Sequence, residues 1–191
     1  MKILFVRHLP TVRRTDDLAA NWRLDGTQTA RELDLIHRLK NICLDLIVTS
    51  QERKSIDTAQ RVFFQAQPHR SDPRLNELSR GAFIQDYETH VQSVFDHPHE
   101  SIGGWEPASG CLHRILDLIG ELNTSESRSV GFVGHGLQSA LLRAYVLDQP
   151  KARLHDWQRI EMPDLIELTV DPDLQIEVTR DFTGLTASTA R

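Results

Sequence analysis

Residues 2–8 have the sequence Lys-Ile-Leu-Phe-Val-Arg-His, an apolar run that stops at two polar residues. The consecutive large apolar residues Ile3 to Val6 indicate a strand that is buried on both faces, as in a parallel sheet covered by helices. Similar runs recur at Leu44–Val48 and Ser129–Val133, and helical segments separate them. This alternation predicts a central, mostly parallel sheet.

The helical segments and a final hairpin complete the predicted fold. We expect helices at Gly26–Lys40, Arg53–Gln65, about Ile84–Phe95, Pro107–Leu122 and Gly136–Leu147. Leu165–Val170 and Gln175–Thr179, joined by an Asp-Pro-Asp turn, predict an antiparallel hairpin. The expected fold class is α/β, a three-layer sandwich with a mostly parallel central sheet, helices on both faces and an antiparallel edge strand.

The composition narrows the class of protein and of ligand. The chain has 191 residues, of which 39% are hydrophobic and 26% charged, which is ordinary for a folded globular protein. Its formal net charge of −5 gives no general attraction to nucleic acid or to an anionic membrane. No apolar stretch has the length of a membrane span, so a cytoplasmic location is the default expectation.

Polar side chains follow the predicted strands at the points where the strands end. Arg7 and His8 follow the first strand, Arg53 and Lys54 follow the second, and His135 follows the third. The carboxyl ends of parallel strands lie at one edge of a sheet, where ligands of α/β proteins bind. Taken singly, each of these residues is as consistent with a surface or capping role as with a role in ligand binding. Together, these cations and histidines predict a pocket for a phosphate-like dianion.

Five sequence blocks have the order and spacing of motifs in a known family. Val6–Thr11 resembles Arg-His-Gly-x-Thr, and Thr49–Ala59 resembles Ser-x-x-x-Arg-x-x-x-Thr-Ala. Leu75–Gly81 keeps the spacing of Leu-x-Glu-x-x-x-Gly. Gly103–Glu106 loosely resembles Gly-Glu-Ser, and Val133–Gly136 resembles a second histidine block. On these blocks the chain resembles the histidine phosphatase superfamily, also called the phosphoglycerate mutase-like superfamily, over residues 1 to about 148. The chain is short for the mutases, which favours the phosphatase branch.

The resemblance implies roles for particular residues. His8 would accept the phosphoryl group, Arg7, Lys54 and His135 would stabilise its oxygens, and Glu77 would protonate the leaving oxygen and then activate water. Further contacts with the phosphate or substrate would come from Thr11, Arg14, Arg53 and Gly136. The resemblance implies no cofactor and no metal.

Three positions depart from the family pattern. Leu9 stands where the family has glycine, and Arg14 stands where an asparagine often contacts phosphate. The Thr58-Ala59 pair fixes the register so that Lys54 occupies the position of the second arginine, with Arg53 one residue earlier. We expect Lys54 to face the pocket, because neighbouring residues on a helix point about 100° apart.

The predicted function is that of a metal-independent phosphatase acting on a small phosphomonoester through a phosphohistidine at His8. One alternative is a phosphate- or phosphoprotein-binding regulatory module with little turnover, and another is a phosphohistidine-protein phosphatase. We expect one domain over residues 1–191, with 65–104 capping the site and 183–191 forming a loose tail. Phe83, Tyr87, Phe95 and Trp105 could contact the leaving group or belong to the core. The sequence identifies neither the physiological substrate nor whether the protein is a monomer or a homodimer.

Overall fold

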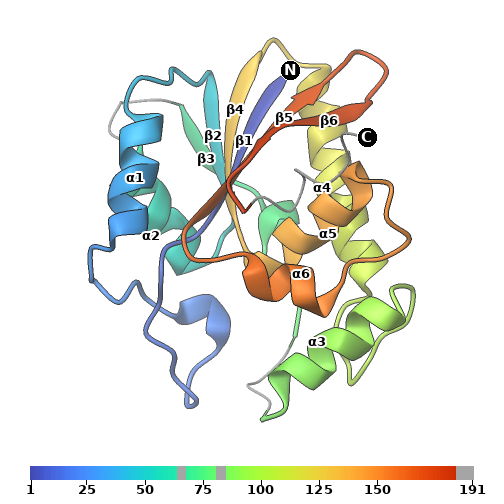
Figure 1. Ribbon diagram of the computed structural model, residues 1–191. Helices are drawn as coiled ribbons and strands as arrows, with labels where there is room; N and C mark the ends of the chain where they lie inside the picture. The colour runs from blue at the N-terminus through green and yellow to red at the C-terminus, as the bar shows by residue number, and fades with distance from the viewer. Residues whose placement is uncertain (64–67, 81–84, 184–191) are drawn as a thin grey trace.

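The computed structural model describes residues 1–63, 68–80 and 85–183. A six-stranded sheet in the order β3-β2-β4-β1-β5-β6 forms its centre (Figure 1). The strands are β1 (Lys2–Arg7), β2 (Leu46–Thr49), β3 (His69–Ser71), β4 (Ser129–Gly134), β5 (Asp164–Val170) and β6 (Ile176–Asp181). Strands β3, β2, β4 and β1 are parallel neighbours, whereas β5 pairs antiparallel with both β1 and β6. The predicted α/β class, with a mostly parallel sheet and an antiparallel edge, is confirmed.

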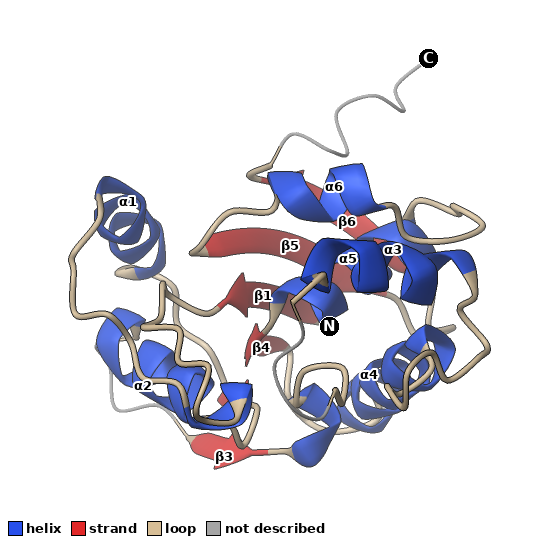
Figure 2. Ribbon diagram, turned by 90° about the horizontal axis from the view of Figure 1, so that it is seen from below, coloured by secondary structure: helices blue, strands red, loops and turns tan. Residues whose placement is uncertain are grey.

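Helices cover both faces of the sheet (Figure 2). They are α1 (Ala30–Leu39), α2 (Arg53–Val62), α3 (Tyr87–Asp96), α4 (Ala108–Asn123), α5 (Gly136–Val146) and α6 (Leu154–Arg159). Alternate residues of β1 enter two separate cores. Leu4 and Val6 pack in the core under α1 and α2, while Ile3 and Phe5 pack in the core under α4 and α5. Burial on both faces explains why β1 is a continuous apolar run.

The element boundaries differ from the predictions where capping or pairing decides them. Helix α1 begins at Ala30 instead of Gly26, because the Thr29 hydroxyl accepts a hydrogen bond from the Glu32 amide at 3.1 Å and caps the helix there. Strand β3 was not predicted, since its three side chains are all exposed and show no apolar alternation. Helix α6 was also not predicted, because its six residues are too few to show a helical repeat of apolar positions. The predicted helix ends at Gln65 and Ile84 lie outside the described residues.

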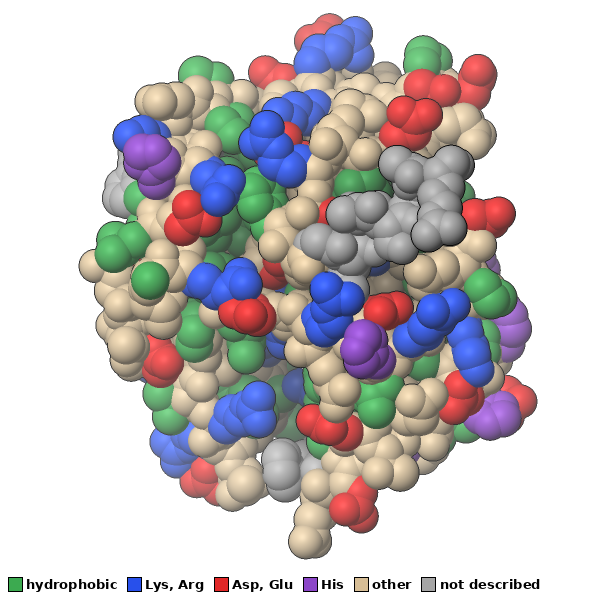
Figure 3. Space-filling model, viewed as in Figure 1, with side chains coloured by type: hydrophobic (Ala, Val, Ile, Leu, Met, Phe, Trp, Pro, Cys, Tyr) green, Lys and Arg blue, Asp and Glu red, His purple; other side chains and the backbone are tan. Residues whose placement is uncertain are grey.

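The outer surface carries charges of both signs. On the face shown in Figure 3, basic and acidic side chains are interspersed, and neither sign dominates a large area. Within the described ranges, no helix has both the length and the hydrophobicity needed to cross a membrane.

Candidate active site

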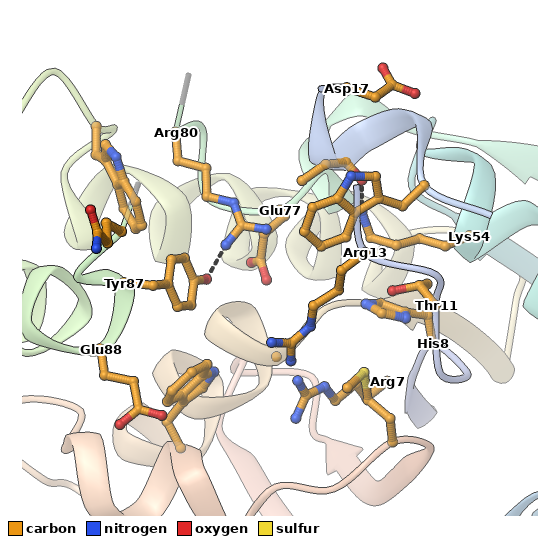
Figure 4. A pocket seen from close by; sticks show the side chains of 17 residues that line it. Arg7, His8, Thr11, Arg13, Asp17, Lys54, Glu77, Arg80, Tyr87 and Glu88 are labelled. Atoms are coloured by element: carbon orange, nitrogen blue, oxygen red, sulfur yellow. Dashed lines mark hydrogen bonds between the residues drawn. The ribbon is translucent and has the colours of Figure 1, made fainter. Parts of the chain in front are cut away.

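A cavity of about 270 Å³ opens at the carboxyl ends of β1 and β4. The predicted site residues that line it are Arg7, His8, Thr11, Lys54, Glu77 and Gly136. His135 is fully buried behind them, with its ring centroid 5.3 Å from that of His8. The parallel arrangement of β1, β2 and β4 therefore gathers residues that are far apart in the sequence, as Figure 4 shows for the labelled side chains.

The backbone fixes the orientation of the His8 ring. The His8 amide donates to the Gly134 carbonyl at 3.0 Å, and His8 Nδ1 lies 2.7 Å from the Leu9 carbonyl oxygen. A carbonyl oxygen can only accept, so Nδ1 carries the proton and Nε2 keeps its lone pair. Burial lowers the pKa of His8 well below its ordinary value, and the charges of His135, Lys54 and Arg7 lower it further. The ring is therefore neutral near pH 7.

Leu9 is accommodated without backbone strain. Its side chain is 2% exposed and packs in the core under α1 and α2. The non-glycine residues with positive φ among those described are Asp148 and Leu174, so Leu9 avoids the left-handed region, as we expected. The Leu9 amide donates to the Thr58 hydroxyl at 3.0 Å, which links the loop after β1 to α2.

The Arg7 guanidinium lies against the first residue of α5. It donates to the Ile160 carbonyl oxygen. A Cβ atom added to Gly136 would lie 2.8 Å from Arg7 Cζ, which is closer than real contacts allow. A glycine at position 136 is thus what leaves room for Arg7. Burial lowers the pKa of Arg7, and the charges of Glu77 and Asp164 oppose that shift.

Lys54 and Arg53 point in different directions. Lys54 is 3% exposed, lines the cavity, donates to the Ala19 carbonyl oxygen at 2.7 Å and pairs with Glu52. Arg53 instead pairs with Asp57 one helical turn later, at 2.8 Å, on the exposed side of α2. The structure thus places Lys54, and not Arg53, at the cavity.

His135 is held by two residues that the sequence analysis did not single out. Its Nε2 atom lies 2.8 Å from the Ser50 hydroxyl and 3.4 Å from a Glu52 carboxylate oxygen. Its Nδ1 atom is buried and has no hydrogen-bond partner among the described residues. Burial lowers the pKa of His135 well below the ordinary value, and Lys54 and Arg80 add to the shift. Ser50 and Glu52 both lie in the Thr49–Ala59 block, which was the signal that could have found them.

Glu77 lies at the N-terminus of α5, across the cavity from His8 (Figure 4). Its carboxylate accepts hydrogen bonds from the Leu78 amide at 3.0 Å and the Leu137 amide at 3.2 Å. Burial raises the pKa of Glu77, which favours a protonated carboxyl group.

The Glu106–Arg114 pair holds the Glu77 loop in place. Arg114 Nε lies 2.9 Å from Glu106, and Arg114 Nη2 donates to the Glu77 carbonyl oxygen at 3.1 Å. Glu106 in turn accepts from the Ser79 amide at 3.0 Å. These contacts give the pair a structural role beside the site.

Two arginines at the cavity were not predicted. Arg14 lies outside the cavity lining and pairs with Asp16 at 2.7 Å, whereas its neighbour Arg13 lines the cavity. Arg80, three residues after Glu77, also lines the cavity and donates to the Tyr87 hydroxyl. Arg80 lies within a recognised block, but no motif or periodicity marks Arg13.

Aromatic side chains form much of the remaining wall. Tyr87 and Trp105 line the cavity together with Trp22 and Trp157. Phe95 is fully buried in the core under α4 and is not a cavity residue. Phe83 lies outside the described residues. Over residues 1–63, 68–80 and 85–183, no cluster of three or more histidine, cysteine, aspartate or glutamate side chains is arranged to hold a metal ion.

The family model for the histidine phosphatase superfamily, branch 1, matches residues 3–179. The chain belongs to this superfamily. The family assignment predicted from the sequence is thereby confirmed, and so is its enzyme class, a phosphatase of the histidine phosphatase superfamily. No curated protein matches the chain in sequence.

Solved structures of low sequence identity share this histidine phosphatase fold. The alpha-ribazole phosphatase from Shigella flexneri is 19% identical, with a TM-score of 0.67 and coverage of 95% of both chains. The mycobacterial glucosyl-3-phosphoglycerate phosphatase is 21% identical, with a TM-score of 0.68 and coverage of 94% of this chain and 96% of the other. Bacillus stearothermophilus YhfR is 21% identical, with a TM-score of 0.70 and coverage of 93% and 95%. At this level of identity the likeness shows the fold.

Proposed function

We propose that this histidine phosphatase hydrolyses a small phosphomonoester through a phosphohistidine intermediate on His8, without a metal ion. The observation that carries the proposal is the contact of His8 Nδ1 with the Leu9 carbonyl oxygen at 2.7 Å. It leaves Nε2 unprotonated in a cavity that Arg7 and Lys54 also line. A neutral imidazole beside cations is the combination that nucleophilic attack on a phosphate dianion requires.

In the first step, the His8 Nε2 lone pair forms a bond to phosphorus as the bond from phosphorus to the leaving oxygen breaks. Arg7, Lys54 and His135 stabilise the charge on the equatorial oxygens. The leaving oxygen takes a proton from Glu77, whose raised pKa suits an acid.

In the second step, Glu77, now a carboxylate, accepts a proton from water. The resulting hydroxide oxygen attacks phosphorus, the bond from phosphorus to His8 Nε2 breaks, and inorganic phosphate leaves. The neutral His8 is regenerated with its lone pair. The mycobacterial glucosyl-3-phosphoglycerate phosphatase has been solved in complex with inorganic phosphate, which supports a phosphate site in this fold.

The cavity supports a small substrate. Its volume of about 270 Å³ lies just below the usual range for ligand pockets. Part of its wall comes from Tyr87, Glu88 and Trp105, of which the first two belong to residues 65–104 and the third follows directly. This contribution supports our proposal that the segment caps the site within one domain, although 65–67 and 81–84 lie outside the described residues.

The test is a panel of phosphomonoesters assayed with and without EDTA. We expect hydrolysis that the chelator leaves unchanged, and acid-labile phosphate on His8 in quenched reactions. Full activity of a His8→Ala variant in EDTA would disprove the nucleophile, and complete loss of activity in EDTA would disprove the metal-free mechanism.

One observation favours the binding-module alternative. The Lys54 ammonium is already paired with Glu52, so less of its charge is available to a phosphoryl group in the transition state. Tight binding of phosphate or vanadate with negligible hydrolysis over the whole panel would support that alternative. Hydrolysis of a phosphohistidine protein in preference to every small ester would support the protein-phosphatase reading.

A further inference from the structure

The arginines of the cavity differ from most others in the chain. Arginines elsewhere are mostly paired with carboxylates, as Arg31 is with Glu161. Within the described part of the chain, Arg7, Arg13 and Arg80 line the cavity and have no carboxylate within ion-pair distance. Three guanidinium groups therefore share a small cavity without direct neutralisation.

The contacts of Arg7 and Arg80 leave their charges available. Arg7 donates to a backbone carbonyl oxygen, that of Ile160. Arg80 donates to the Tyr87 hydroxyl, and its Cζ atom lies 4.8 Å from the centre of the Tyr87 ring and 5.9 Å from that of Trp105. These neutral partners orient the two guanidinium groups but do not cancel their charge.

The Arg13 side chain has no hydrogen bond or ion pair with any residue in the described ranges. Figure 4 shows it reaching into the cavity, with the guanidinium group between Tyr87 and Arg7. Its charge acts on Arg7 and on Tyr87. The charges that act most on His8 are instead those of His135, Lys54 and Arg7. The Arg13 guanidinium thus lies on the side of the cavity that faces Tyr87 and Arg7.

We propose that the leaving group of the substrate carries an anionic group of its own, which binds between Arg13 and Arg80 beside the Tyr87 hydroxyl. This inference rests on the proposed phosphatase function, in which the transferred phosphoryl group occupies the space between His8, Arg7 and Lys54. Arg13 and Arg80 then determine specificity at the leaving-group end. A carboxylate or a second phosphate would both fit the planar fork of a guanidinium group.

Electrostatic repulsion between the arginines supports the same inference. Burial is the main cause of the lowered pKa of Arg7, and the like charge of Arg13 adds to it. An anion placed among the three arginines converts that repulsion into attraction. The carboxylates that also line the cavity, those of Asp17, Glu77 and Glu88, form no ion pair with these three arginines.

Matched substrates provide the test. Glycerol 3-phosphate and 3-phosphoglycerate differ by one carboxylate, and the mono- and bisphosphates of propane-1,3-diol differ by one phosphate. We expect kcat/KM for the wild type to favour the anionic member of at least one pair by about tenfold, the effect of one charged hydrogen-bonded contact. In Arg13→Gln this preference should fall to about onefold.

Arg14→Gln is the matched control, since Arg14 is adjacent in sequence but pairs with Asp16 outside the cavity lining. It should keep the wild-type preference. A wild-type preference near onefold for both pairs would overturn the inference. Equal losses on both members of a pair in Arg13→Gln would also overturn it, since they would assign Arg13 to the transferred phosphoryl group.

Binding to a His8→Ala variant separates this inference from the proposed function. Calorimetric titration with the same pairs measures the preference without turnover. Preferential binding that Arg13→Gln removes, with no hydrolysis by the wild type, would support the anion site and reject the phosphatase. Hydrolysis by the wild type, with equal binding of both members of each pair, would support the phosphatase and reject the anion site. Thermal unfolding of each variant checks that it is folded.

Discussion

His8 Nδ1 lies 2.7 Å from the carbonyl oxygen of Leu9, the residue that follows it. The ring that we propose as the nucleophile is therefore oriented by the backbone, through a contact that does not depend on which side chain occupies position 9. This relationship explains how leucine can replace the usual glycine without altering the orientation of the His8 ring.

Stability should fall as the pH drops below about 6.5, the pKa of an unperturbed histidine. The pKa values of His8 and His135 are lowered in the folded state, so the unfolded state binds more protons below that pH. Each histidine should contribute a slope of up to about 1.4 kcal/mol per pH unit. Urea unfolding at pH 7.5, 6.5 and 5.5 measures the free energy.

Glu77 opposes this trend, because its raised pKa makes the folded state take up a proton first as the pH falls. A Glu77→Gln background removes the opposing contribution. In that background His135→Asn should reduce the slope, whereas replacement of the exposed His99 should not. An unchanged slope in His135→Asn would contradict the lowered pKa of His135.

Lys54→Arg should raise phosphate affinity or kcat/KM, because a guanidinium group can bind two phosphate oxygens at once. Lys54→Ala should lower kcat by about a hundredfold, the usual cost of losing one donor to a developing anion. Arg53→Ala removes a similar charge from the exposed side of α2 and should have little effect. Steady-state kinetics with inorganic phosphate as inhibitor gives both quantities. A large loss confined to Arg53→Ala would transfer the role to Arg53.

Glu77→Gln should lower kcat by roughly a hundredfold or more on alkyl phosphates. The loss of kcat/KM, which reports the first step, should be much smaller on p-nitrophenyl phosphate than on alkyl phosphates, because the nitrophenolate oxygen leaves without a proton. Activity on alkyl esters should decline as the pH rises through the raised pKa of Glu77, where the acid form is lost. Equal losses of kcat/KM on both kinds of ester would show that Glu77 is not the acid of the first step.

Gly136→Ala should weaken phosphate binding by about tenfold, because its Cβ would lie 2.8 Å from Arg7 Cζ and displace the guanidinium group. Gly120→Ala is the matched control. Gly120 lies within α4, and its added Cβ would lie 3.9 Å from Leu174 Cδ1, an ordinary contact distance. The Gly120→Ala variant should therefore preserve activity and stabilise the helix by up to about 1 kcal/mol. Competition between phosphate and substrate measures the affinity. Wild-type affinity in Gly136→Ala would show that Arg7 does not need this space.

The sequence predicted the sheet and much of the candidate site for one physical reason. Strands buried on both faces, such as Ile3–Val6, are continuous apolar runs, and their carboxyl ends must share an edge when they are parallel. The direction of the strands is therefore enough to bring Arg7, His8 and His135 together. The position of Lys54 came instead from the family resemblance, because the register of Thr58-Ala59 within the motif implied that Lys54 faces the cavity.

The sequence could not predict side chains whose roles depend on how loops pack. Arg13 and Arg14 are adjacent and chemically identical, and only the path of the loop after β1 sends one into the cavity and the other to Asp16. Glu52 became a partner of Lys54 and His135 because α2 begins beside β4.

The sequence by itself therefore determined the fold and the residues at the strand ends, because burial and strand direction fix them locally, whereas the role of His8 as nucleophile was implied by the family resemblance. Only the tertiary structure decided the protonation of His8, the pairing of Lys54 with Glu52 and the unpaired charge of Arg13. Those properties arise from burial and from the way that loops and helix ends pack around the cavity. The position of His8 thus follows from the first strand, whereas the specificity that we propose for Arg13 and Arg80 comes from packing.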